Sequence, residues 1–136
     1  TFTYGLAIDL TETPCQETVA NDTQAQAEPY CAPWFGTIFP AGDADFVKVQ
    51  PTSSGTMTVA TSDFGDGACA SNGVNTIVRI FDVNGTELTV DDDSGPGDCS
   101  LATRSVIGNA VYFVKVQAAP AASPVTFEYR LDITVP

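Results

Sequence analysis

Alternation of hydrophobic and polar positions predicts β-strands along most of the chain. The clearest case is 125–134, where Phe127, Tyr129, Leu131 and Ile133 fall on one face and charged residues fall on the other. We predict strands at Phe2–Leu10, Trp34–Phe39, Asp45–Gln50, Thr56–Thr61, Val74–Asp82, Thr86–Val90, Ala102–Ile107, Val111–Ala118 and Val125–Thr134. Helical periodicity never extends beyond about two turns, and 23–28 is the segment that could form a helical turn.

Turn-forming residues separate these strands and indicate the fold class. Glycine, proline, asparagine and aspartate cluster between the apolar segments, and Asn84-Gly85 in FDVNGTEL predicts a two-residue hairpin. Many short strands at this spacing are typical of an antiparallel β-sandwich. We therefore expect an all-β, jelly-roll-like sandwich over residues 11–136, preceded by an extended arm over residues 1–10.

Strand direction predicts where the acidic residues gather. If successive strands alternate in direction, the loops 40–44, 62–73 and 91–99 share one end of the sandwich. These loops contain Asp43, Asp63, Asp66, Asp91, Asp92, Asp93 and Asp98. The opposite loops, 51–55, 83–85 and 108–110, contain no acid. The same alternation brings Cys69 to Cys99 and leaves Cys15 to pair with Cys31.

Composition restricts the class of function. The chain has 136 residues, 17 acids, 5 bases and a net charge of -12, which argues against nucleic acid or an anionic membrane as a partner. It has no histidine, which excludes histidine triads and histidine metal sites. Four cysteines outside any C-x-x-C pair favour two disulfides in an oxidising compartment. The chain begins at Thr1 without an apolar leader, so we expect a processed, secreted or cell-surface protein.

An ordered set of segments resembles a known family. GDADFVKV, GTMTVAT, NTIVRIFDVNGTEL, DDDSG, AVYFVKV and FEYRLDIT follow one another as in bacterial pre-peptidase C-terminal domains. These are secreted β-sandwich modules related to the collagen-binding domains of clostridial collagenases. The resemblance implies the same sandwich fold and a non-catalytic role.

The resemblance also implies calcium ligands. ETVANDTQAQA is similar to the family's E-x-E-P-N-D-T segment, although Val19 and Ala20 depart from it and remove one carboxylate. Carried over by position, the ligands are Glu17, Asn21, Asp22, Asp43 and Asp45. Oxygen ligands without histidine or free thiol suit Ca²⁺ rather than a transition metal.

The run Asp91–Asp93 allows two interpretations. Asp91 and Asp93 project to the same side of an extended segment, so together they could bind a second cation. The alternative is a solvated loop without an ion.

The N-terminal segment leads to the functional hypothesis. Its apolar face consists of Phe2, Tyr4, Leu6, Ile8 and Leu10. Such a strand either pairs with its own sheet or adds to the sheet of a neighbouring copy. We favour a secreted structural subunit that assembles into a filament by strand addition. The alternative is an accessory module of a secreted hydrolase that binds a polysaccharide or a collagen-like ligand. We expect no catalysis.

Overall fold

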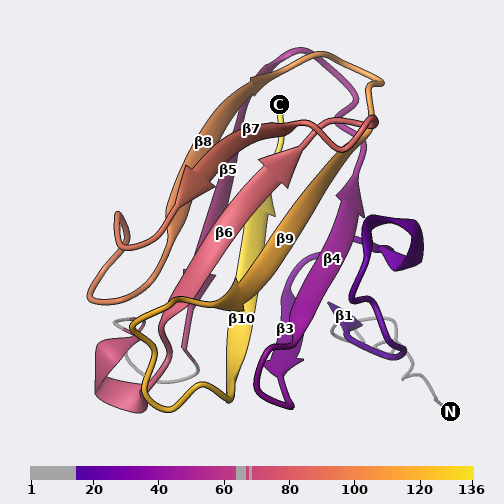
Figure 1. Cartoon of the computed structure of the whole chain (residues 1–136). Helices are drawn as coiled ribbons and strands as arrows, with labels where there is room; N and C mark the ends of the chain where they lie inside the picture. Colours follow the sequence, from indigo (N-terminus) through magenta and orange to yellow (C-terminus); the bar gives the residue numbers. More distant parts are fainter. Residues whose placement is uncertain (1–14, 64–66, 68) are drawn as a thin grey trace, which may run out of the picture.

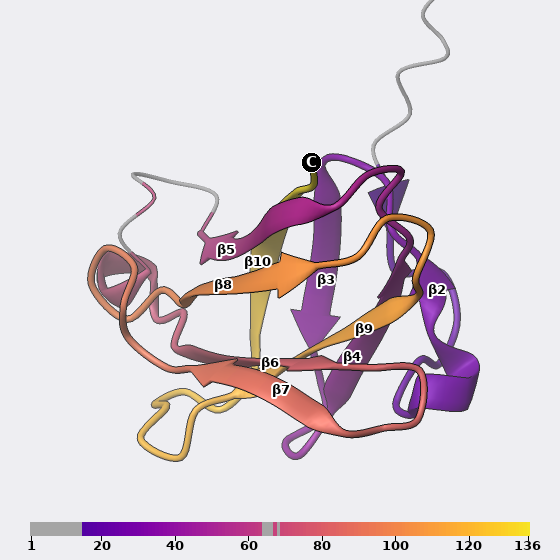
Figure 2. The ribbon, with the colours of Figure 1, turned by 90° about the horizontal axis from the view of Figure 1, so that it is seen from above.

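Two five-stranded sheets pack face to face in the computed structural model, which describes residues 15–63, 67 and 69–136. One sheet has the order β1-β3-β10-β5-β8 and the other has the order β2-β4-β9-β6-β7. Figure 2 looks along this sandwich and shows the two layers on either side of the core. The predicted fold class is confirmed.

Eight of the ten described strands lie close to predicted segments, and the two-residue strands β1 and β2 were not predicted. The first sheet contains β1 (Cys15–Gln16), β3 (Trp34–Ile38), β10 (Phe127–Thr134), β5 (Gly55–Ser62) and β8 (Leu101–Val106). The second contains β2 (Glu28–Pro29), β4 (Ala44–Val49), β9 (Tyr112–Ala118), β6 (Thr76–Phe81) and β7 (Glu87–Asp91). Two 3₁₀ turns complete the described elements, η3 (Gln24–Gln26) and η4 (Ala70–Asn72). η3 falls within the predicted helical turn.

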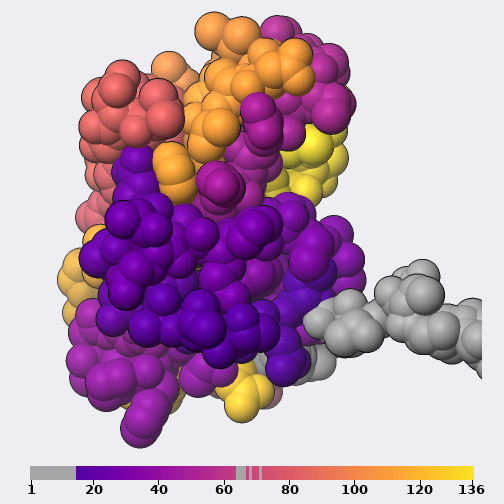
Figure 3. Space-filling model, turned by 90° about the vertical axis from the view of Figure 1, so that its right-hand side faces the viewer, coloured from indigo at the N-terminus to yellow at the C-terminus, as the bar shows by residue number. Residues whose placement is uncertain are grey.

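Parallel pairing corrects the expectation of purely antiparallel sheets. β1 pairs in parallel with β3, and β2 pairs in parallel with β4, while every other ladder is antiparallel. Both parallel strands have only two residues, and they belong to the segment 15–33, which we call the leading segment. In Figure 3 this indigo segment lies across the side of the sandwich and reaches the pink β6–β7 hairpin. Gln24 makes that contact by donating its Nε2 to the carbonyl of Val83 at 3.2 Å.

Inward-facing side chains from both sheets form one core. The alternation predicted for β10 is confirmed, since Phe127, Tyr129, Leu131 and Ile133 are all buried. The largest fully buried side chains include Trp34, Tyr129, Ile38, Met57, Ile80 and Leu131. Removing this apolar surface from water is the main favourable contribution to folding.

The predicted disulfides are confirmed. Cys15 is bonded to Cys31 and Cys69 to Cys99, with Cα–Cα distances of 5.7 and 5.3 Å. The second bond joins the loop after β5 to the loop before β8, as the predicted strand directions require. In Figure 1 the loops before β4, after β5 and after β7 all lie towards the lower end, and the β6–β7 turn lies at the upper end.

The β6–β7 turn differs from the predicted two-residue hairpin. The Asp82 N–H donates to the carbonyl of Thr86, which leaves three residues in the loop, and Gly85 has a φ of +83°. The Asp82 carboxylate also accepts bonds from the N–H groups of Asn84 and Thr86 at 2.8 and 2.9 Å. This side chain stabilises a wider turn, and it places one acid at the end predicted to contain none.

The predicted arm, Phe2–Leu10, lies outside the described residues. Within the described residues, no helix has the length and apolar character needed to cross a membrane.

Candidate metal centre

Glu17 reaches the centre because β1 pairs with β3. The Glu17 N–H donates to the carbonyl of Phe35 at 3.0 Å, which continues the parallel ladder by one residue. Its Oε2 accepts the N–H of Thr37 at 3.1 Å. The carboxylate therefore lies along the outer edge of β3, beside a pocket of about 380 Å³ lined by Gln16, Glu17, Phe35, Gly36, Thr37 and Glu128.

Asp43 and Asp45 come from the β3–β4 loop and the start of β4. The Asp43 carboxylate accepts the N–H groups of Phe39 and Ala44 at 2.9 and 2.8 Å, which fixes the loop. Asp45 points inward with the core residues of β4 and is only 1% exposed. Its Oδ2 accepts a 2.6 Å hydrogen bond from the hydroxyl of Tyr129, and its Oδ1 has no hydrogen-bond donor.

Three carboxylates converge in this place. One oxygen each from Glu17, Asp43 and Asp45 lies within 4.8 Å of the others. Burial raises the pKa of Asp45 to about 8, and the charges of Glu17 and Asp43 add to this although the Tyr129 hydroxyl opposes it. The pKa of Glu17 is also raised, chiefly by burial. The three acids thus repel one another when ionised, and the metal-free centre relieves this repulsion by keeping a proton on Asp45.

Asn21 contributes a second unsatisfied oxygen. This residue is fully buried, and its backbone carbonyl accepts the N–H of Phe46 at 2.9 Å. Its side-chain Oδ1 has no donor. A buried polar atom without a partner costs on the order of 1–3 kcal/mol, so Asn21 and Asp45 each leave an oxygen that a bound cation would satisfy.

The remaining predicted ligand, Asp22, is exposed and lies near enough for its charge to raise the pKa of Glu17 and of Asp45. Glu28 was not predicted. It accepts the hydroxyl of Thr18 at 2.6 Å and the Asn21 Nδ2 at 3.4 Å, and its charge also raises the pKa of Glu17. Glu28 lies in β2, a two-residue strand that the alternation pattern does not reveal.

The donor set fits a hard cation. It consists of carboxylate and amide oxygens, and two of these oxygens, Asp45 Oδ1 and Asn21 Oδ1, are buried without a hydrogen-bond donor. Calcium takes six to eight such ligands in flexible geometry, whereas zinc and copper favour nitrogen and sulfur. Glu17, Asn21, Asp43 and Asp45 would hold the ion, with Asp22 and Glu28 beside them.

The loop Asp91–Asp93 has a different arrangement. Asp91 accepts the N–H groups of Leu101 and Ser94 at 2.7 and 3.2 Å, and it also accepts the Ser94 hydroxyl. Over the described residues, neither Asp91 nor Asp93 joins a group of three acids around one point. The second cation stays a prediction.

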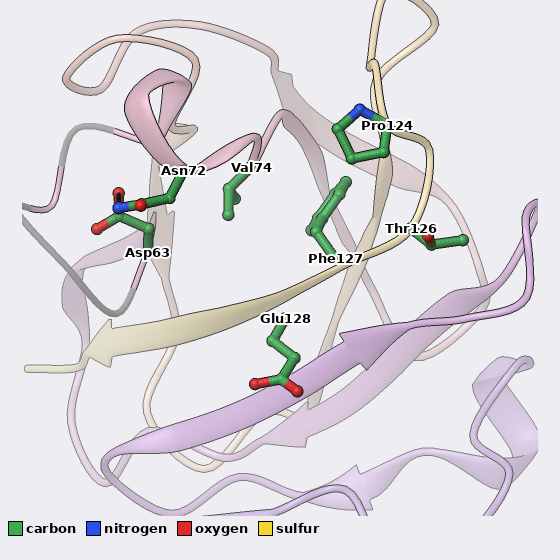
Figure 4. A pocket seen from close by; sticks show the side chains of 7 residues that line it. All are labelled: Asp63, Asn72, Val74, Pro124, Thr126, Phe127 and Glu128. Atoms are coloured by element: carbon green, nitrogen blue, oxygen red, sulfur yellow. Dashed lines mark hydrogen bonds between the residues drawn. The ribbon is translucent and has the colours of Figure 1, made fainter.

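A further pocket of about 510 Å³ lies between the loop after β5 and the start of β10, lined by Asp63, Asn72, Val74, Pro124, Thr126, Phe127 and Glu128 (Figure 4). The Asp63 carboxylate accepts the N–H groups of Gly67 and Cys69 and the Nδ2 of Asn72, at 2.7, 3.1 and 2.8 Å. These donors fix the Asp63 side chain against the loop after β5.

Comparison with known proteins places the fold. No protein-family model matches the sequence, and a search of curated proteins finds no match. Among solved structures, the chain is similar to the pre-peptidase C-terminal domain of collagenase from Bacillus anthracis, with a TM-score of 0.56. The match covers 90% of this chain and 98% of that one, at 9% sequence identity. The resemblance seen in the sequence is therefore confirmed for the fold.

Proposed function

We propose that this chain is a non-catalytic, calcium-binding β-sandwich of the extracellular space. The observation that carries the proposal is the pair of buried oxygens, Asp45 Oδ1 and Asn21 Oδ1, that lack donors beside three converging carboxylates. A divalent cation coordinated by these oxygens would replace the missing hydrogen-bond donors and balance the charge of the carboxylates.

The proposed ion has a structural role. Glu17 and Asn21 belong to the leading segment, whereas Asp43 and Asp45 belong to the sandwich. A shared cation therefore ties the leading segment to β3 and β4. Tyr129 orients Asp45 by donating its hydroxyl, and Gly36 makes room for the ring, since a Cβ at Gly36 would lie 2.5 Å from the Tyr129 Oη.

Calcium binding is testable by isothermal titration calorimetry on the metal-free protein. We expect the parent chain to bind calcium and Asp45→Asn to lose this binding, because the variant removes the charge of the most buried carboxylate. Asp93→Asn is the matched control, since it removes the same charge from the other acidic loop. Equal binding by the parent and Asp45→Asn would reject the site.

The extracellular location is supported by the two disulfides, which persist in oxidising compartments. The absence of histidine from the sequence and the structural roles of Asp63 and Asp91 favour a non-catalytic protein.

For the biological role, we propose a structural subunit that assembles with copies of itself. In this proposal Phe2–Leu10 adds as a strand to the sheet of a neighbour, which gives a head-to-tail contact that repeats. It is supported by the unbroken alternation of Phe2, Tyr4, Leu6, Ile8 and Leu10 with small or polar residues. Electron microscopy of the full chain should show filaments, and a chain lacking residues 1–10 should form none.

The alternative role is an accessory module of a secreted hydrolase. It is supported by the likeness of the fold to a domain of a collagenase. Under this alternative the full chain is monodisperse in the microscope and binds an immobilised matrix polymer, such as collagen, when calcium is present.

A further inference from the structure

The scarce basic residues of this chain gather on one surface. Lys48, Arg79 and Lys115 each lie between two core residues of their strand, so all three point out of the sheet formed by β4, β9 and β6. They account for three of the five bases in a chain with 17 acids. We call these three side chains the basic face; the strands that carry it face the viewer in Figure 1.

Two of these bases lie directly opposite one another. Arg79 on β6 is in register with Lys115 on β9. Like charges in this position destabilise a sheet. Burial and the charge of Arg79 both lower the pKa of Lys115. Such an arrangement is unexpected in a chain so rich in acids, because an acid at either position would be favourable.

The acids of the same molecule neutralise this face only in part. Arg79 pairs with Glu87 at 3.0 Å and donates to the Oε1 of Gln117 at 2.8 Å. In the described part of the chain, neither Lys48 nor Lys115 forms an ion pair. Lys115 instead lies over the ring of Phe46, with its Nζ 5.7 Å from the ring centre.

Aromatic rings lie beneath the basic face. They account for the length of its side chains, but they do not require a positive charge at each of them. Phe46 and Phe113 lie outside the main core and are only 8% and 9% exposed, and the rings of Phe46 and Phe81 are 6.0 Å apart. The methylene stem of a lysine can cover such rings, and an uncharged long side chain would cover them equally well. Glu87 uses the charge of Arg79 and the Phe46 ring uses that of Lys115 in part, whereas the charge of Lys48 has no acidic partner in the described part of the chain.

Negative charge is left without a partner in another place, the loop 91–98. Asp93 is exposed, and burial together with the neighbouring acids Asp93, Asp91 and Asp98 raises the pKa of Asp92. The ion pairs of the described residues, Arg79–Glu87 and Arg130–Asp132, involve none of these acids. One molecule thus has a basic face and an acidic loop that do not neutralise each other.

We propose that the basic face of one copy binds the acidic loop 91–98 of a second copy. Charge complementarity identifies the partner, since the chain supplies both surfaces. The contact is heterologous because the two surfaces differ, so each bound copy keeps one free surface of each kind and further copies can add. The net charge of -12 opposes this contact at long range, but at 0.15 M salt charges are screened beyond about 8 Å and the direct contacts remain.

This inference deepens the assembly role proposed above, but it uses neither residues 1–10 nor the metal centre. The test is sedimentation velocity of the full chain in calcium, at low and at high sodium chloride. We expect self-association that weakens with salt. Lys48→Glu with Lys115→Glu should weaken it by about tenfold or more, and Asp93→Lys with Asp98→Lys should do the same.

Mixing the two double variants provides the sharpest test. The mixture pairs an intact face with an intact loop and a reversed face with a reversed loop, so it should associate with the two variants alternating, while neither variant should form the charged contact alone. A chain with all four reversals should associate again. Arg130→Glu is the matched control for Lys48→Glu, because it makes the same charge change on the opposite sheet, and it should leave association unchanged.

Other outcomes overturn the proposal. Mixed variants that stay monomeric, or Arg130→Glu as damaging as Lys48→Glu, would show that net charge rather than this contact controls association. If the face variants associate normally but lose binding to polygalacturonate, the face is a site for acidic glycans instead. If only removal of residues 1–10 abolishes association, strand addition is sufficient and the charged contact is absent.

Discussion

Two acid-rich regions at the same end of the sandwich differ in what their oxygens contact. In the loop 91–98, the Asp91 carboxylate accepts bonds from the main chain of Ser94 and Leu101. In the metal centre, Asp45 accepts one hydroxyl and its other oxygen has no donor, although the residue is buried. In the loop, Asp92 Oδ1 also lacks a partner, but no three of its acids converge on one point. The comparison teaches that neither the number of acids nor a single unsatisfied oxygen indicates a metal site. Carboxylates that converge beside such oxygens do.

We expect the largest loss of stability from removing the disulfides that anchor these two regions. Replacing Cys69 and Cys99 by serine should lower the free energy of unfolding by about 3–4 kcal/mol, because the bond closes a long loop. The loss should be the same in calcium and in chelator. Urea denaturation under both conditions measures it.

The matched variant replaces Cys15 and Cys31 by serine. This change should lower the free energy of unfolding by about 3 kcal/mol. It should also weaken calcium binding, because Cys15 lies two residues before Glu17 and anchors this part of the leading segment. Identical calcium responses of the two cysteine variants would contradict the separation of the two regions.

The next largest effect is the pH dependence of stability in the metal-free protein, to which the metal centre should contribute and Asp91 should not. Asp45 has a pKa of about 8 in the folded chain against 3.8 unfolded, so between these values the folded state holds the extra proton. The stability it contributes is complete below about pH 4 and is lost as the pH rises towards 8. From pH 5 to 8 the free energy of unfolding should fall by on the order of 3 kcal/mol. Asp45→Asn should flatten this decrease, and Asp91→Asn should leave it unchanged.

Calcium should restore that stability. An ion bound only by the folded state adds about 2.7 kcal/mol at a concentration one hundred times its Kd, which raises the Tm by on the order of 10 °C. The gain should increase with pH because the ion needs the ionised form of Asp45. Scanning calorimetry in calcium and in chelator measures it, and a response retained by Asp45→Asn would place the ion elsewhere.

The smallest effect belongs to the acidic loop. Asp91→Ala should cost about 1–2 kcal/mol, because it leaves the N–H of Leu101 without its acceptor. Asp93→Ala, an exposed neighbour, should change the stability by less than about 0.5 kcal/mol. Neither change should depend on calcium if the loop binds no ion, and a calcium-dependent loss in both variants would support the second cation.

The sequence predicts the long strands because their side chains alternate over many residues, as Phe127, Tyr129 and Leu131 do in β10. It does not predict β1 or β2, since a two-residue strand has no period and forms only when the rest of the sandwich is present. Glu28 was missed for this reason. The width of the β6–β7 turn was also missed, because the Asn84-Gly85 pattern does not include the bonds that Asp82 makes.

For the candidate centre, the resemblance nominated Glu17, Asp43 and Asp45, and one oxygen of each lies within 4.8 Å of the others in the folded chain. It could not indicate which oxygens would lack donors, because that depends on atoms such as the Tyr129 hydroxyl, which comes from a strand 84 residues further along the chain. Nor could it indicate that the Asp91 carboxylate would accept hydrogen bonds from the nearby main chain, at Ser94 and Leu101. Hydrogen-bond partners are a property of the folded chain, and residue types limit them only loosely.

The position of β10 has a consequence for how the protein is made. Although β10 is the last strand of the chain, it lies inside its sheet, paired with β3 on one side and β5 on the other. During synthesis from the N-terminus, β3 and β5 are complete long before the strand that joins them exists. A nascent chain that lacks β10 therefore exposes an unpaired edge of β3 and of β5 and the core residues that β10 covers, which makes it prone to aggregation. This sheet can be completed only after β10 has been synthesised.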